Sequence, residues 1–430
     1  MKFGKLRGYR VNVTMLQRHL GMGGAIMIGL ASMLGAGVFF VWAPAAEAAG
    51  SGLLIGLVIA GVIAVLNALS STQLAIVHPV SGGTYAYARA TVGPWTGFAA
   101  GWLFLAGKTA SVGAIALIAG SYLWPELARP VAIAAVVVLA LVNMTGIRST
   151  AAVSAVIVTV VLLGLAAVIA TAIISSPSAP ALPTARGGSL YGILQSAGLL
   201  FFSFAGYARM ATLGEEVRDP RRTLPRAIVG ALGITLVIYL TLGVLTTTIL
   251  GTDALAASNA PLADLVGASS PLAPVIRTVA GIACLGSLAG ILAALSRTSL
   301  AMARERDMPG ALGYISPRTS APIVAEALFA ILAIAGIVFL EPARLVGFSS
   351  CAVLMYYAIA HLSALRQPAA ERWLPRSVQV VGLLGCLVLA LTLGWLPIAY
   401  ALGVLTLGLA VRAVLLRHRP GSVPTARTNS

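Results

Sequence analysis

An uncharged stretch of 26 residues, 21–46, constrains the fold of this chain more than any other part of the sequence. It is longer than the roughly 20 apolar residues that an α-helix needs to cross a bilayer. Gly35 and Gly37 lie near its middle, and a glycine inside a helix costs roughly 1 kcal/mol relative to alanine. The stretch therefore predicts a membrane helix interrupted at Gly35–Gly37, with half-helices over residues 22–34 and 38–46.

Such an interruption leaves peptide groups without helical partners. The outer half-helix begins with free N–H groups, and the inner half ends with free C=O groups. Open backbone at membrane depth is tolerated only where it lines a cavity in the protein. An amino acid matches this arrangement, because its carboxylate can bind the amides and its ammonium the carbonyls. The alternative is that the glycines only let a neighbouring helix pack closely.

The composition is that of a polytopic membrane protein. Hydrophobic residues make up 59% of the chain and charged residues 9%, and no polar stretch is long enough for a soluble domain. The formal charge of +16 does not indicate nucleic acid as a partner, because the basic residues lie in short loops, where they set membrane orientation. The three cysteines have neither disulfide nor metal-ligand spacing. We expect the lipid bilayer as a partner, and no cofactor or metal.

The apolar stretches predict an all-α fold with twelve membrane spans. Their expected bounds are 21–47, 52–77, 94–123, 130–147, 151–174, 190–214, 227–250, 275–303, 322–340, 343–364, 377–394 and 396–413. One side of these spans carries 22 Lys and Arg residues and the other side carries four. This bias places both termini in the cytoplasm of a multi-pass protein of the cell membrane. The N-terminus has no cleavable signal-peptide pattern, so the first span is expected to be retained.

The sixth span repeats the pattern of the first. Its apolar start, 190–202, is followed by a small-residue segment, 203–206, and then by 207–214. The two spans are five apart and cross the membrane in opposite directions, which indicates an inverted-repeat transporter. The expected units are a cytoplasmic segment 1–20, a first repeat 21–174, a second repeat 175–365, two peripheral spans 366–413 and a cytoplasmic tail 414–430.

Several separated motifs in this order resemble those of the amino acid–polyamine–organocation (APC) permeases. They are 35–39 (GAGVF), 79–87 (PVSGGTYAY), 143–146 (NMTG), 201–207 (FFSFAGY), 214–220 (GEEVRDP), and Arg297, Ala303, Arg304 and Pro309 near the end of the eighth span. The resemblance covers residues 20 to 365. It implies the five-plus-five inverted-repeat fold shared with sodium-coupled leucine transporters, with helices 1 and 6 broken.

The resemblance also implies a substrate site at the two breaks. Its residues would be Met33, Gly35, Ala36 and Gly37 in the first broken helix, and Phe202, Ser203, Phe204, Ala205 and Tyr207 in the second. The amides of Ala36 and Gly37 would bind the substrate carboxylate. The carbonyls of Met33, Phe202 and Ala205 would bind its ammonium group.

Aromatic and charged residues near the second break are expected to gate this site. Phe204 and Tyr207 would line or close the pocket, although ordinary aromatic packing is an alternative explanation. Glu215, Glu216 and Arg297 lie in segments expected to be cytoplasmic. Ion pairs between these segments would latch the inner gate, whereas a solvated loop that only sets topology is the alternative.

Lys108 lies in the third predicted span, roughly 21 Å along a helix from Pro94. This depth is too central for the side chain to reach either membrane surface. Ionisable residues at such depths face the bundle interior and mark functional sites. Burial lowers the pKa of a lysine, so the amine can exchange a proton near neutral pH. We therefore predict Lys108 as the proton-coupling residue; the alternative is a charged lysine that binds carbonyls of a broken helix.

The chain departs from the family pattern at some positions. Some proton-coupled members have a lysine in the fifth span, where this chain has Val160 or Val161. Arg209 lies just past the second break, and it would pair with a nearby glutamate or cap the pocket. Ser32 and Ser287 are candidate sodium ligands, but isolated serines in membrane helices usually bond their own backbone. Sodium coupling is therefore less expected than proton coupling.

The sequence thus predicts a secondary transporter of an amino acid, not an enzyme. No carboxylate is expected at mid-membrane depth in the spans that form the pocket, which favours a neutral substrate. An exchanger of an amino acid for its amine is one alternative, and a non-transporting membrane sensor is another. The four histidines, expected at span edges, form no catalytic motif with other residues.

Overall fold

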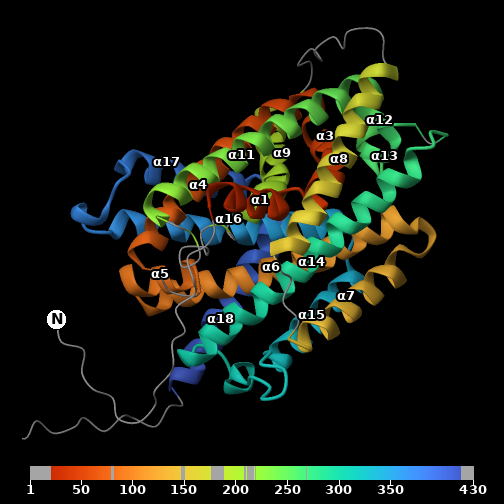
Figure 1. Ribbon diagram of the computed structural model, residues 1–430. Coiled ribbons are helices and arrows are strands. Elements are labelled where there is room, and N and C mark those ends of the chain that lie inside the picture. Colours follow the sequence, from red (N-terminus) through yellow and green to blue (C-terminus); the bar gives the residue numbers. More distant parts are fainter. Residues whose placement is uncertain are drawn as a thin grey trace, which may run out of the picture.

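The computed structural model describes residues 21–78, 82–146, 151–175, 188–207, 210, 217, 219–267 and 269–417. Every regular element within these residues is a helix (Figure 1). The first part of the chain forms α1 (Met22–Met33), α2 (Ala36–Phe40), α3 (Trp42–Ala49), η1 (Gly50–Gly52), α4 (Leu53–Val77), α5 (Thr84–Thr91), α6 (Pro94–Leu123), η2 (Pro125–Leu127), α7 (Ala128–Met144) and α8 (Ala151–Ser175).

The second part begins with α9 (Leu190–Phe204) and a short 3₁₀ turn, η3 (Ala205–Tyr207). It continues with α11 (Pro220–Leu245), the π-turn η5 (Thr246–Leu250), α12 (Thr252–Ala256), α13 (Pro261–Leu265), α14 (Ala273–Arg304), η6 (Gly310–Gly313), α15 (Ile323–Phe339), α16 (Pro342–Arg366), η7 (Ala369–Glu371), α17 (Arg376–Leu391) and α18 (Trp395–Arg417).

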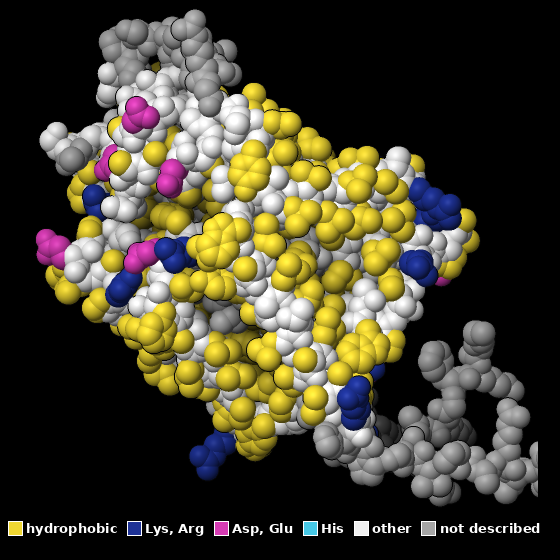
Figure 2. Space-filling model, turned by 180° about the vertical axis from the view of Figure 1, so that it is seen from behind, with side chains coloured by type: hydrophobic (Ala, Val, Ile, Leu, Met, Phe, Trp, Pro, Cys, Tyr) yellow, Lys and Arg dark blue, Asp and Glu magenta, His cyan; other side chains and the backbone are white. Residues whose placement is uncertain are grey.

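Nine helical stretches of the described chain are long and apolar enough to cross a membrane. Three further apolar helices are shorter, namely α1, α15 and α17. The first is short because the chain leaves the helix after Met33 and enters a new one at Ala36. Hydrophobic side chains cover most of the middle of the face shown in Figure 2, and charged side chains lie toward its edges. A multi-pass membrane protein presents such a surface to lipid.

Helix α6 lies at the centre of the bundle, and small residues let its neighbours approach it closely. A Cβ atom on Gly107 would lie 3.0 Å from the Ala352 side chain of α16, and one on Gly113 would lie 3.3 Å from the Ala333 carbonyl oxygen of α15. Close van der Waals packing of this kind stabilises helix pairs in lipid, where the hydrophobic effect between helices is weak.

Some helices lie where the sequence analysis expected loops. Helix α5 follows the expected second span, and α12 and α13 precede α14 (Figure 1). All three are eight residues or shorter, so length-based prediction of membrane spans does not find them. Pro261 at the start of α13 provides the local signal for that helix.

A charge cluster ties α5 and α18 to the loop after α14. Asp307 accepts from Arg89 at 2.9 Å and from Arg412 at 2.8 Å, and its side chain is 5% exposed. The Tyr85 hydroxyl donates to the same carboxylate at 2.9 Å, while burial and then Asp307 raise the pKa of this phenol. Glu305 forms a more exposed ion pair with Arg89 at 3.1 Å.

Arg412 also lies over the rings of Trp95 and Phe98, with its guanidinium carbon 4.8 Å from each ring centre. A cation on an aromatic face is favourable when it is removed from water. The last helix, expected at the periphery of the bundle, is thus anchored to the start of α6 by a buried charge.

We expect Asp307→Asn to lower the free energy of unfolding by roughly 3 kcal/mol, because it removes the buried carboxylate that pairs with the buried Arg412 and the half-buried Arg89. Thermal unfolding in detergent measures the effect. Glu305→Gln is the matched control: Glu305 is 53% exposed, and exposed pairs contribute about 0–1 kcal/mol. Equal effects of the two variants would contradict the central role given to Asp307.

Candidate functional site

The first broken helix is interrupted at Leu34 and Gly35. The Leu34 amide closes α1 by donating to the Leu30 carbonyl at 2.8 Å. Gly35 then takes an extended conformation, with φ −102° and ψ −147°, and α2 starts at Ala36. The break is shorter than the expected segment, since Ala36 and Gly37 already belong to α2. Their amides are the first of that helix and lack partners within it, as the predicted role in carboxylate binding requires.

The second broken helix changes its winding after Phe204. Ser189 caps the start of α9 by accepting from the Gly192 amide at 3.0 Å. At the other end, the Ala205 amide donates to the carbonyls of Phe201 and Phe202, and a 3₁₀ turn follows. The Phe202 carbonyl, predicted to bind an ammonium group, therefore already accepts one bond, and its second lone pair remains for a ligand.

The two breaks lie against each other. A Cβ atom on Gly206 would overlap the backbone carbonyl of Ser32, next to the end of α1. A Cβ atom on Gly37 would lie 2.6 Å from Cα of Ser203. The structure thus brings the predicted residues of the two helices together, because the glycines let backbone meet backbone. Gly35 meets a third element, since its Cβ would overlap the Ser287 hydroxyl of α14.

Tyr239 of α11 bridges the two breaks. Its hydroxyl is 2.7 Å from the carbonyl oxygen of Met33 and 3.3 Å from that of Ser203. Its ring packs on Phe204, with the ring centres 5.1 Å apart. The hydroxyl thus lies at the Met33 carbonyl, where the substrate ammonium was expected. The sequence analysis missed this residue; a lone tyrosine in the middle of an apolar helix is a signal, because a buried phenol needs a partner.

Aromatic rings surround the second break. Tyr207 is buried and stacks on Tyr357 of α16, with the ring centres 5.2 Å apart. Tyr356 contacts Tyr357 at 5.0 Å and Phe104 of α6 at 5.2 Å. Phe204 is fully buried against Tyr239, which is the packing arrangement considered as the alternative for this residue.

Lys108 lies on the face of α6 that meets α16. Phe104, one turn earlier, contacts Tyr356, and the Ser111 hydroxyl, one turn later, lies 2.6 Å from that of Ser349. The lysine side chain is 8% exposed, and no ion pair joins it to another described residue. A buried amine without an anion beside it is costly to keep charged.

The predicted gating residues are only partly described. Glu215, Glu216 and Arg209 lie outside the described residues. Arg297 is exposed near the end of α14, and the ion pairs found after that helix are those of the Asp307 cluster. Of the two candidate sodium ligands, Ser32 donates to its own helix, at the Ile28 carbonyl, whereas Ser287 faces Gly35.

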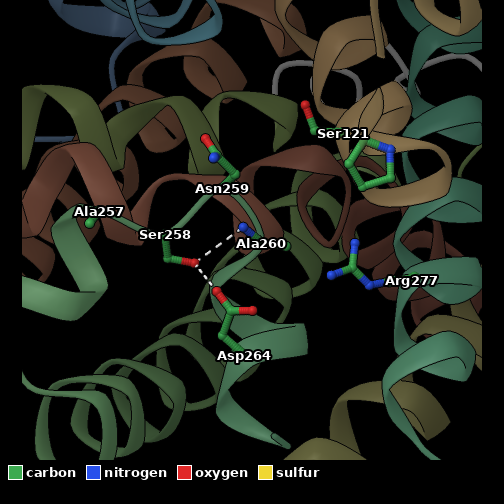
Figure 3. Close-up of a pocket in the computed structure, with 8 residues that line it drawn as sticks. Ser121, Ala257, Ser258, Asn259, Ala260, Asp264 and Arg277 are labelled. Carbon is green, nitrogen blue, oxygen red and sulfur yellow. Dashed lines mark hydrogen bonds between the residues drawn. The ribbon is translucent and has the colours of Figure 1, made fainter. Parts of the chain in front are cut away.

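A cavity of about 520 Å³ lies away from the breaks (Figure 3). It is lined by Ser121 near the end of α6, by Pro125 of η2, by residues 257–260 and Asp264 around α13, and by Arg277 of α14. Figure 3 shows Ser258 between the Ala260 amide and the Asp264 carboxylate. Tyr122, beside Ser121, donates to the Phe39 carbonyl at 2.7 Å and so ties the end of α6 to the broken helix.

The glycine contacts bring the backbones of the two breaks close together. Among the described residues, no three His, Cys, Asp or Glu side chains are grouped so that they could hold a metal ion.

Comparisons with known proteins agree with the helical architecture. A family model described as "Amino acid permease" matches residues 24–413. An uncharacterised transporter of Mycobacterium tuberculosis is 47% identical over 94% of this chain and 93% of its own length. A branched-chain amino acid permease of Bacillus subtilis is 27% identical over 92% of each chain. A serine/threonine exchanger of the same bacterium is 25% identical over 80% of this chain and 82% of its own.

We expect Gly206→Ala to destabilise the protein by roughly 1–3 kcal/mol, because the added methyl group meets backbone that cannot rotate away. Gly233→Ala in α11 is the matched control. Nothing lies within 4 Å of a Cβ at Gly233, so alanine should stabilise the helix by up to about 1 kcal/mol. Thermal unfolding in detergent measures both changes. A Gly206→Ala protein as stable as the parent would contradict the close contact of the two breaks.

Proposed function

The chain belongs to the amino acid permease family of the APC superfamily, and we propose that it carries an amino acid across the cell membrane by proton-coupled secondary active transport. One observation carries the proposal: two helix breaks meet, with the end of α1 against Gly206 of η3 and the start of α2, at Gly37, against Ser203 of α9. A small zwitterion is the solute that both kinds of peptide group can bind.

The proposed architecture is a twelve-span protein with both termini in the cytoplasm. The contact between α1–α2 and α9–η3 supports an inverted repeat over 21–174 and 175–365, with α17 and α18 added after it. The basic residues that favour this orientation include those of the Asp307 cluster, which then lies at the cytoplasmic end.

The proposed substrate is a neutral amino acid. The residues that meet at the breaks are uncharged, and Lys108, one turn from Phe104 of the aromatic group, is a buried base. An apolar or hydroxylated side chain suits such surroundings, and the names of the two Bacillus relatives, a branched-chain permease and a serine/threonine exchanger, agree with this range. A dicationic substrate would need a carboxylate that we do not find among these residues.

Proton coupling through Lys108 rests on its position. The residue is buried, lies on the face of α6 that meets α16, one turn after Phe104, and has no ion pair with a described residue. The amine can therefore lose its proton at modest cost when the surroundings dry and regain it when water enters. Sodium coupling has weaker support, because Ser32 bonds its own helix.

Exchange of one amino acid for another without net proton movement is a second candidate, favoured by the name of the serine/threonine exchanger. The two modes differ in one measurement. A coupled carrier accumulates substrate in proteoliposomes when the outside is made acidic, whereas an obligate exchanger needs substrate on the opposite side.

A thermal-shift screen of the purified protein against the amino acids tests the proposed substrate class. A ligand at 100 times its Kd stabilises the folded state by about 2.7 kcal/mol, so a neutral amino acid should raise Tm measurably. The corresponding amino acid amide, which lacks the carboxylate, is the control ligand and should not. If no amino acid raises Tm or enters proteoliposomes, the proposal is wrong.

We expect Lys108→Gln to abolish the rise of uptake on acidification, because the amide cannot carry a proton. Lys108→Arg should fail in the same way, because its guanidinium cannot release one. Thr109→Val is the matched control, since the Thr109 hydroxyl only bonds the Leu105 carbonyl of its own helix. Uptake of labelled amino acid at several pH values measures the effect, and an unchanged pH dependence in Lys108→Gln would exclude this residue as the coupling group.

A further inference from the structure

Three helices bury a seam of polar side chains between the second break and one end of the bundle. We define the polar seam as Asn67, Ser70 and Ser71 of α4, Tyr357 and His361 of α16, and Gln379 of α17; each is 5% exposed or less. His361 lies near the C-terminal end of α16, within the span expected at 343–364, and is fully buried. The sequence pattern did not indicate this burial.

Contacts along the helices show that the seam is continuous. Asn67 of α4 bonds with His361 of α16. Six residues further along each segment, Gln73 of α4 bonds with Gln367, which directly follows α16. At the near end, Tyr357 stacks on Tyr207 of the second break. At the far end, Gln73 accepts from the Leu374 amide at 3.1 Å. From Tyr357 to Gln367 the seam extends about 15 Å along α16.

Asn67 fixes the state of the imidazole. Its Oδ1 atom lies 2.6 Å from Nε2 of His361 and 3.0 Å from Sγ of Cys386. An amide oxygen only accepts hydrogen bonds, so Nε2 carries the proton and Nδ1 presents a lone pair. Gly382 makes room for the ring, because a Cβ atom there would overlap it.

Many polar atoms of the seam have no hydrogen-bond partner within the described chain. These atoms are Nδ1 of His361, the hydroxyls of Ser70 and Ser71, both amide atoms of Gln379, and Nε2 of the adjoining Gln367. The Tyr207 hydroxyl, by contrast, bonds with the side chains of Tyr357 and Asn67. Buried polar groups in native proteins are bonded to protein or to ordered water, and an interior site with several polar partners is one where water binds. The seam therefore has the chemistry of a water-binding column.

We propose that the polar seam is a proton relay, in which His361 passes protons through bound water between Tyr207 at the substrate site and the Gln73 end of the bundle. The inference rests on the proposed proton-coupled transport and names the route of the proton. A hydronium ion on one side gives a proton to Nδ1 and becomes water. The Nδ1–H group then gives a proton to the next water, which becomes hydronium. Nε2 stays bonded to Asn67, so the ring returns to its starting form with no net change.

The surroundings of His361 suit a relay better than a storage site. The titratable groups beside it are Cys386 from α17, Tyr207 from the second break and Tyr357 from its own helix. Asn67 is its neighbour from α4. Lys108 lies on α6, one turn after Phe104, which contacts Tyr356 of α16. No anion of the described chain pairs with the imidazole, so the charged form is short-lived and releases its proton.

The test compares His361→Gln with His78→Gln, a control at the end of α4 outside the seam. Two assays use the same proteoliposomes: counterflow of a labelled amino acid without a pH gradient, and acid-driven accumulation with internal acidification. We expect His361→Gln to retain counterflow while accumulation and proton flux fall by about tenfold or more. His78→Gln should match the parent in both assays.

If His361→Gln carries protons at the same rate as the parent protein, the relay proposal is wrong. Counterflow without any proton flux in the parent protein overturns the relay but leaves a carrier. Absence of both activities in the parent overturns the relay together with the proposed function.

A second measurement does not depend on transport by the Gln variant. With His19, His78 and His418 replaced by Gln, His361 is the one imidazole left, and ¹⁵N NMR reports the protonation of each ring nitrogen. We expect the neutral Nε2–H tautomer, with the lone pair on Nδ1 that the relay requires. A ring that carries its proton on Nδ1 instead overturns the proposal.

Discussion

The requirement that every peptide group at membrane depth finds a partner governs this structure. Between Met33 and Ala36 the helix is broken, and a similar change of winding follows Phe204. The two breaks lie against each other, and glycines allow the close contacts between them. The Tyr239 hydroxyl lies near the carbonyls of Met33 and Ser203. Neither break would be stable facing lipid alone, so the pairing of these helices is a condition of the fold.

The remaining polar groups follow the same rule at different depths. Asp307 gathers two arginines and a phenol at one end of the bundle, where the charges can be partly hydrated. In the interior, the polar seam around His361 combines neutral groups instead. Lys108 is the exception, a buried base without a described anion. Its surroundings are the aromatic rings between α6 and α16, which ties its protonation to the packing of these helices.

Hydropathy predicted most helices, because long apolar runs can form little else in a membrane. The glycines at 35 and 37 also predicted the first break, although the structure confines it to Leu34 and Gly35. Tyr239 and His361 were missed because their roles depend on which helices face each other, and a single span does not carry that information. The Asp307 cluster was missed for the same reason: its two arginines come from α5 and α18, hundreds of residues apart.

Tyr239 has one hydroxyl proton and two carbonyl neighbours, at 2.7 and 3.3 Å. It cannot bond both fully, so the oxygen of Ser203 is left the poorer acceptor. An ammonium group brings three N–H bonds and would remove this shortage. If an amino acid binds at the breaks as proposed, its ammonium group would satisfy both carbonyls at once, and this gain would favour a rearrangement of the two broken helices around it.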